Sequence, residues 1–214
     1  MDMTLWKTCL ATILLLAGSL SSPAGTAAEA AAEVVPEAAK TGIAAETGKP
    51  LVVFDIDGTL TPHNLFVYEA RAGAAQAVAA YAARGYQVIY LTTRIPLFQS
   101  GLPAWLSRNG FPDAPLHIAQ TPEQRRDPAS FKAGVLQAYA QAGWRLAWAY
   151  GDSSTDFAAY ARAGIPQKRV FALRRRLAST CAEGLYRACL DGWQAHLRQL
   201  PGDFGGNQRG VEQY

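Results

Sequence analysis

The chain has 214 residues, 50% of them hydrophobic, and a formal net charge of +3. This apolar share is too high for a disordered chain, and the length suits one well-buried domain. The small net charge gives no argument for nucleic acid as a partner, and we expect none.

The N-terminal residues 1–28 have the pattern of an export signal. Lys7 precedes an apolar run at 9–20, and small residues suited to cleavage follow at 21–30. The apolar run has about 12 residues, whereas a helix that spans a bilayer needs about 20. The pattern therefore predicts a cleaved signal peptide and an exported protein, periplasmic or secreted. An uncleaved membrane anchor is the alternative.

Strand and helix patterns alternate after a flexible linker, rich in Ala and Glu, at 29–49. The folded domain is expected to begin near Pro50. In chain order we expect a strand at 51–56, a helix at 68–85, a strand at 86–92, a helix at 101–110, a strand at 115–119, a helix at 128–143, a strand at 145–151, a helix at 154–164 and a strand at 169–173.

This alternation predicts an α/β domain over residues 50–176. Its parallel sheet should carry helices on both faces, as a three-layer Rossmann-like fold. Residues 177–214 are expected to form a helical extension. The connections at 60–67 and 95–130 are too short for a full cap domain, so we expect little or no cap and an open site.

Two cysteines, Cys181 and Cys189, remain if the signal is removed. An even pair in an exported protein suggests a disulfide. In one continuous helix the two would lie about 12 Å apart, whereas a disulfide needs Cα atoms within about 7 Å. A bond therefore requires a turn, which Gly184 could supply. Two thiols packed in a core are the alternative.

Polar clusters follow three of the predicted strands. They are Asp55 with Asp57, then Thr92, Thr93 and Arg94, then Asp152 with Asp156. In parallel α/β sheets, binding sites form at the carboxyl ends of the strands. These clusters, far apart in the sequence, are therefore expected to meet at one edge of the sheet.

The chemistry of these clusters favours a metal and a phosphate. Two carboxylates as close as Asp55 and Asp57 raise each other's pKa unless a cation separates them. With Asp152 they form a hard oxygen site that suits Mg²⁺. Residues 92–94 offer hydroxyls, backbone N–H groups and a cation to phosphate oxygens, and Lys132 adds a further positive charge. Such a set suits phosphoryl transfer.

Each motif also has a plainer interpretation. The Asp-Gly-Thr run could be a turn after a strand, and Ser153 with Asp156 resembles a helix capping box. Thr92 and Thr93 could be ordinary strand-end residues, and Lys132 a solvated lysine. The occurrence of all the motifs in order, at successive strand ends, favours the catalytic interpretation.

With these motifs in this order, the sequence resembles the haloacid dehalogenase superfamily of phosphohydrolases. The matching motifs are DIDGTLT at 55–61, YLTTR at 90–94, Lys132 and GDSSTD at 151–156. Within the superfamily, the segments 85–111, 128–136 and 155–173 are similar to the catalytic domain of lipins, the Mg²⁺-dependent phosphatidate phosphatases. The related domain of membrane-associated phosphatidylinositol transfer proteins shares this outline without the aspartate pair. The intact pair in this chain therefore favours activity.

The resemblance implies a catalytic role for several motif residues. Asp55 would be the nucleophile that forms an aspartyl-phosphate, and Asp57 would protonate the leaving alcohol and then activate water. Thr92 would bind the phosphoryl group, with Thr93 the less favoured candidate, and Lys132 would neutralise its charge. The other candidates for substrate binding are Gly58, Thr59 and Arg94.

The resemblance also implies a Mg²⁺ site. The ion would be held by Asp55, Asp152 and the backbone carbonyl of Asp57, while Asp156 would orient Lys132 or a metal-bound water. Lipins commonly have Asn at the position of Asp152, so this site carries more negative charge.

The favoured function is therefore an exported Mg²⁺-dependent phosphatase that acts on phosphatidate or a similar phospholipid monoester. An open site admits a phosphate presented at an anionic membrane surface, and the basic C-terminal stretch could lie against such lipid or simply be solvated. A broad-specificity acid phosphatase or nucleotidase with the same site is the first alternative. A non-catalytic module that binds phosphatidate or phosphoinositide is the second.

Overall fold

The computed structural model describes residues 48–63 and 68–201. The predicted signal peptide and nearly all of the predicted linker lie outside these ranges. Each helix within the ranges is too short or too polar to span a bilayer.

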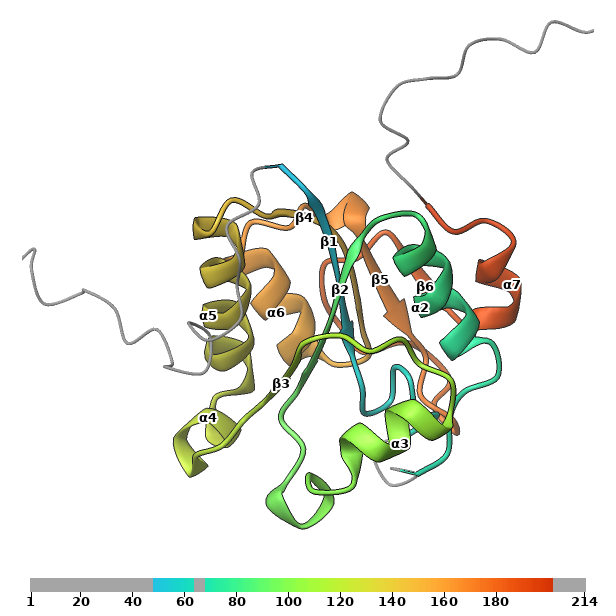
Figure 1. Ribbon diagram of the computed structural model, residues 1–214, viewed down its shortest axis with the longest axis horizontal. Coiled ribbons are helices and arrows are strands. Elements are labelled where there is room, and N and C mark those ends of the chain that lie inside the picture. The colour runs from blue at the N-terminus through green and yellow to red at the C-terminus, as the bar shows by residue number, and fades with distance from the viewer. Residues whose placement is uncertain (1–47, 64–67, 202–214) are drawn as a thin grey trace, which may run out of the picture. The chain divides into compact units, whose positions relative to one another are not determined.

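The described residues form one six-stranded parallel sheet in the order β3-β2-β1-β4-β5-β6 (Figure 1). Its strands are β1 Pro50–Asp55, β2 Gln87–Thr92, β3 Leu116–Ile118, β4 Arg145–Gly151, β5 Val170–Leu173 and β6 Ala188–Leu190. The predicted parallel α/β fold is confirmed. The central strands are β1 and β4, which carry the two aspartate motifs at their carboxyl ends.

Helices cover both faces of the sheet. They are α2 Ala74–Ala83, α3 Leu102–Arg108, α4 Pro122–Arg126, α5 Pro128–Gln141, α6 Ser154–Arg162 and α7 Trp193–Leu197. Figure 1 shows α5 and α6 on one side and α2 and α7 on the other. This layering confirms the expected three-layer arrangement.

Strand β1 shows why the sequence gives these layers. Its fully buried residues alternate between two cores, because successive side chains of a strand point to opposite faces. Val52 and Phe54 pack with α2, α3 and α7, whereas Leu51 and Val53 pack with α5 and α6. A strand buried on both faces in this way is a continuous apolar run, as parallel sheets require.

Some boundaries differ from the sequence prediction. Helix α2 begins at Ala74 rather than near residue 68, because Gly73 precedes it in a left-handed conformation with a φ of 84°. Helix α4 was not predicted, although Thr121 and Gln124 form a capping box at its start.

The C-terminal segment also differs from the expected helical extension. Within the described residues it consists of a long loop, the additional strand β6 and the short helix α7. Strand β6 pairs with β5 in parallel, which extends the domain beyond residue 176. The short helix α7 brings Trp193 into the core, fully buried against Tyr150.

A disulfide joins Cys181 to Cys189, with a Cα–Cα distance of 5.8 Å. The expected pairing is confirmed. The intervening turn passes through Gly184, whose φ is 157° and where a Cβ atom would lie 2.3 Å from the Phe157 ring. The bond therefore ties the loop after β5 to strand β6.

Candidate active site

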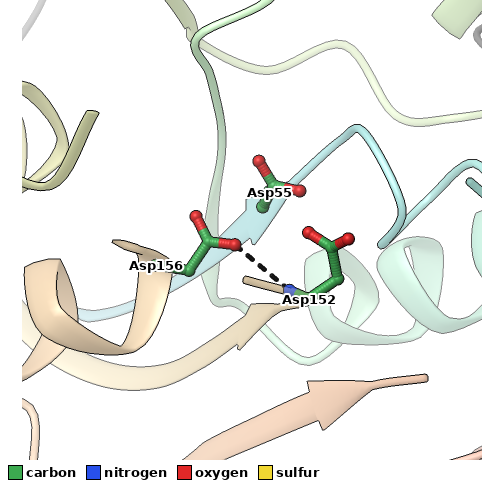
Figure 2. A group of neighbouring side chains, drawn as sticks. All are labelled: Asp55, Asp152 and Asp156. Atoms are coloured by element: carbon green, nitrogen blue, oxygen red, sulfur yellow. Dashed lines mark hydrogen bonds between the residues drawn. The ribbon is translucent and has the colours of Figure 1, made fainter. Parts of the chain in front are cut away.

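The polar clusters meet at the carboxyl ends of the strands, as the sequence predicts. Asp55 ends β1, Thr92 ends β2, Asp152 follows β4 and Asp156 lies in the first turn of α6. Figure 2 shows the carboxylates of Asp55, Asp152 and Asp156 around one space. One oxygen from each of these three lies within 4.8 Å of the others.

Lys132 lies near the N-terminal end of α5, between two of these carboxylates. Its Nζ donates hydrogen bonds to Asp55 Oδ1 at 2.6 Å and to Asp156 Oδ1 at 2.5 Å, with a side chain only 4% exposed. Burial raises the pKa of Asp55 well above its ordinary value, and Lys132 offsets part of that rise. Lys132 is thus not a solvated lysine. Its charge is committed to the buried acids.

Asp156 uses both of its oxygens on donors from the protein. Oδ1 accepts from Lys132, while Oδ2 accepts from the backbone N–H groups of Asp152 and Ser153 and from the Ser153 hydroxyl, at 2.7–3.1 Å. Burial opposes ionisation, but Lys132 and these donors hold the pKa of Asp156 below its usual range. The contacts favour its role in orienting Lys132 over a contact with metal-bound water. The capping-box interpretation also holds, because Ser153 caps α6.

Gly58 and Thr59 belong to the loop that follows Asp55 and Asp57, and neither of them lines the pocket. Thr59 Oγ1 donates to Asp55 Oδ2 at 3.0 Å, and Thr61 Oγ1 accepts from the Gly58 N–H. Gly58 has a φ of 90°, and a Cβ atom there would lie 1.9 Å from Asp152 Oδ2. Glycine is required at this position because the loop backbone runs directly against Asp152.

Asp57 is held by two residues from the end of β2. Thr92 Oγ1 donates to Asp57 Oδ2 at 2.8 Å. Arg94 donates to the same carboxylate from Nη2 at 2.7 Å and from Nε at 3.0 Å, so its planar group grips Asp57 with two donors. Among the described residues, no hydrogen-bond partner reaches the buried Nη1 of Arg94.

Two arginines that the sequence patterns did not single out complete the site. Arg175 follows β5, and its Nε pairs with Asp152 Oδ2. Burial, followed by Asp156, raises the pKa of Asp152 to about 6, while Arg175 and Lys132 act against the rise. Because Arg175 follows the end of β5, the rule that sites form at the carboxyl ends of parallel strands could have identified it. The sequence pattern instead places residues 174–176 in the basic C-terminal stretch.

Arg71 ties the first motif to the end of β5. Its guanidinium donates to the carbonyls of Gly58 at 2.8 Å, Thr61 at 3.0 Å and Arg174 at 2.6 Å. Guanidinium groups suit this work because their donors lie in one plane at fixed angles. Sequence patterns carry no signal for this role, since Arg71 falls inside the helix predicted at 68–85.

The site opens into a pocket of about 390 Å³. All the predicted site residues except Gly58, Thr59 and Asp156 line it, so Thr93 and Arg94 lie at its wall as expected. Ile95, Phe98 and Arg175 lie there as well, which gives the pocket an apolar side beside its charged floor. The pocket lining therefore brings together the Lys132 ammonium, the Thr92 hydroxyl and the carboxylates of Asp55, Asp57 and Asp152.

Comparison with known proteins gives one family match. The family described as "PITM 1-3, LNS2 domain" matches residues 52–174. Human membrane-associated phosphatidylinositol transfer protein 1 is 31% identical over 157 residues, and protein retinal degeneration B of Drosophila melanogaster is 30% identical over 156. These matches cover 72% and 70% of the chain, and the chain spans about 12% of each relative's length.

One solved structure, titled "Structure of Pnkp1/Rnl/Hen1 complex", has a similar fold. It superimposes with a TM-score of 0.50 over 60% of this chain and 47% of the other. The sequence identity is 18%, so the likeness concerns the fold alone.

Proposed function

Because this chain belongs to the LNS2 domain family, which has the haloacid dehalogenase-like phosphatase fold, we propose that it hydrolyses phosphate monoesters through an aspartyl-phosphate. The observation that carries the proposal is the convergence of Asp55, Asp57, Thr92 and Lys132 on one pocket. Each of the four has a contact that suits a different role in the reaction.

The first step uses Asp55 as the nucleophile. Its carboxylate oxygen attacks the phosphorus and the bond to the alcohol oxygen breaks, while Asp57 gives a proton to the leaving alcohol. Lys132 offsets the negative charge on the transferring group, and the Thr92 hydroxyl orients Asp57. In the second step Asp57 takes a proton from water, which attacks the phosphorus. The bond to Asp55 then breaks and phosphate leaves.

The acidic residues also fit a divalent cation. Asp55 and Asp152 offer hard carboxylate oxygens, and Mg²⁺ prefers such ligands with its remaining positions open to water and phosphate. Asp156 is less available, because its oxygens already accept from Lys132, Ser153 and the Asp152 backbone. When bound, the ion would neutralise part of the negative charge of the phosphate and would hold one phosphate oxygen in position.

The rim of the pocket supports a phospholipid monoester, such as phosphatidate, as the substrate. Four exposed large apolar side chains lie in the segments that follow β1, β2 and β5, namely Tyr68, Ile95, Leu97 and Leu177. Ile95 lines the pocket, the Tyr68 ring contacts the pocket residue Phe98, Leu97 precedes Phe98 in sequence, and Leu177 lies two residues after Arg175. Leu97 is 76% exposed and Leu177 is 90% exposed. Exposed apolar side chains near a site typically mark a surface that meets a membrane or another partner. The relatives' names also refer to phosphatidylinositol.

The proposal is tested by assaying the purified protein on phosphatidate in phosphatidylcholine vesicles, with AMP and p-nitrophenyl phosphate in parallel. We expect phosphate release from the vesicles that requires Mg²⁺ and stops in excess EDTA. Asp55→Asn should lower turnover by about 10³-fold or more, because an amide cannot attack phosphorus. Efficient turnover of AMP without lipid turnover would instead identify the nucleotidase alternative.

The rim has its own test with a matched control. Replacing Leu97 and Leu177 by serine should lower vesicle turnover by about 100-fold or more relative to turnover of the soluble ester, because two leucines buried in the membrane together contribute roughly 3–6 kcal/mol. Leu185→Ser is the control, since Leu185 is also exposed but precedes β6 at the other end of the strands. An equal loss in the control would remove this support for a lipid substrate.

A second candidate function is non-catalytic binding of phosphatidate or phosphoinositide. It is favoured by the relatives, whose names describe transfer proteins rather than enzymes. Vesicle binding that survives Asp55→Asn, together with no Mg²⁺-dependent phosphate release from the wild type, would establish it.

We also propose that the protein is exported. The Cys181–Cys189 disulfide supports an oxidising compartment, where such bonds persist. Mass spectrometry of the secreted or periplasmic chain, before and after reduction, would test both the cleavage and the bond.

A further inference from the structure

We propose that the Arg175 guanidinium occupies the position beside Asp152 that a divalent ion would take. The ion must displace this guanidinium in order to bind. This inference rests on the proposed function, because it concerns the same metal site. It assigns to Arg175 control over how tightly the protein holds the metal.

The first support is the contact itself. Asp152 is 2% exposed at its side chain, and its Oδ2 pairs with Arg175 Nε. The same carboxylate is one of the three whose oxygens surround a common space. A cation bound between Asp55 and Asp152 would therefore compete with the Arg175 guanidinium for an oxygen of Asp152.

The second support is the balance of formal charge in the site. Four carboxylates, those of Asp55, Asp57, Asp152 and Asp156, are paired with three cationic side chains, those of Lys132, Arg94 and Arg175. The guanidinium of Arg71 also interacts with the charge of Asp152, so the formal charges of the site balance. A divalent ion added to this set would leave two excess positive charges, whereas exchange of the ion for Arg175 leaves one.

The third support is that Arg175 is the cation best able to leave. Lys132 and Arg94 are buried at their side chains, whereas Arg175 is 35% exposed and lies at the pocket wall. Movement into solvent would cost Arg175 little, because its charge is already partly hydrated.

The fourth support is that the backbone around Arg175 is fixed, so the side chain can swing while its base stays in place. The Arg174 N–H donates to Leu190 O at 2.9 Å, and the Arg176 N–H donates to Pro62 O at 2.8 Å. Arg71 holds the Arg174 carbonyl, and the disulfide ties the rest of the loop to β6. The displaced guanidinium therefore stays at the mouth of the pocket.

The experiment measures Mg²⁺ binding directly, by isothermal titration calorimetry on the disulfide-bonded protein without substrate. Arg175→Gln should lower the Kd for Mg²⁺ about tenfold, because the ion no longer displaces a charge-assisted hydrogen bond. Arg175→Lys, which keeps the charge as a shorter point donor, should give a Kd between the two. Circular dichroism checks that each variant is folded.

Arg176→Gln is the matched control. Arg176 lies in the same loop with the same charge, but its side chain pairs with Glu69 rather than with an aspartate of the pocket. Its Kd should equal that of the wild type, which would exclude a general loss of positive charge as the cause.

The outcomes separate the inference from the proposed function. If the wild type binds Mg²⁺ and Arg175→Gln binds with equal or weaker affinity, Arg175 does not compete with the ion and the inference is wrong. If neither protein binds Mg²⁺ at millimolar concentration, the metal site in the proposed function is wrong, and this inference falls with it.

Discussion

Lys132 and Arg175 each pair with carboxylates of the same pocket, yet the two pairs lie in different surroundings. Lys132 comes from a helix inside the fold and is 4% exposed, between two acids that are buried with it. Arg175 comes from a loop and is 35% exposed, although its partner Asp152 is buried.

The difference separates a permanent cation from an exchangeable one. Removal of a charge from a buried pair leaves the partner uncompensated in a medium of low dielectric constant, which is costly. A pair with a partly exposed cation contributes less to stability, because water already solvates that cation. Lys132 therefore contributes a positive charge that stays in the site, whereas Arg175 can be replaced by a ligand.

The sharpest test of the comparison is Lys132→Met. This change keeps much of the side-chain volume but leaves Asp55 and Asp156 buried without their cation. The free energy of unfolding should fall by about 3–5 kcal/mol, as measured by urea denaturation with EDTA present. A loss below 1 kcal/mol would mean that the buried pair is no more important to stability than an exposed one.

The pH dependence of stability sharpens the comparison at Asp152. The pKa of this group is raised to about 6 in the folded protein, against about 3.9 in an unfolded chain. The folded state therefore binds the proton more tightly, and protonation stabilises it. Without metal, the free energy of unfolding should fall by about 2 kcal/mol between pH 4 and pH 6 on account of this group.

Asp152→Asn isolates that contribution, because other groups titrate in the same range. Buried His117 and His196, whose pKa values burial lowers to about 4, change stability in the opposite direction. The quantity to compare is the difference between wild type and variant at each pH. A difference that stays constant from pH 4 to pH 6 would contradict the raised pKa.

The disulfide tests the anchoring of the Arg175 loop. Replacement of Cys181 and Cys189 together by serine should lower the free energy of unfolding by about 2–3 kcal/mol, because the unfolded chain gains freedom over a short loop. Urea denaturation of the wild type with and without reductant gives a second measurement. The two losses should agree, and no loss in either experiment would show that the loop is held by its other contacts.

The smallest effect is expected for the stability of Arg175→Gln. The Arg175 side chain is 35% exposed, although that of Asp152 is buried, so loss of the pair should change the free energy of unfolding by about 1 kcal/mol or less. This measurement uses the same urea titration as Lys132→Met. A loss as large as that of Lys132→Met would show that the two pairs do not differ in kind.

The aspartates of the pocket could be predicted from the sequence because strand ends are local features. Asp55, Thr92 and Asp152 each follow an apolar run, and parallel strands bring their ends to one edge. The two possible roles of Asp156 could not be distinguished, because the choice depends on which donors surround its oxygens.

The remaining contacts depend on residues far apart in the chain. Arg71 and Arg174 are separated by 103 positions, and no periodic pattern connects them. Strand β6 has three residues, too few for a strand pattern to stand out beside a loop rich in arginine. Gly58 and Thr59 are expected in substrate binding because they belong to the motif, whereas in the structure Gly58 lies against Asp152 and Thr59 donates to Asp55.

The bridge from Arg71 to the Arg174 carbonyl bears on how the protein matures. Ribosomes deliver the chain from its N-terminus, so the first aspartate motif emerges more than a hundred residues before the segment that braces it. A nascent chain that stops before residue 174 holds both aspartate motifs but lacks that brace. The pocket can reach its finished form only once nearly the whole domain has been made.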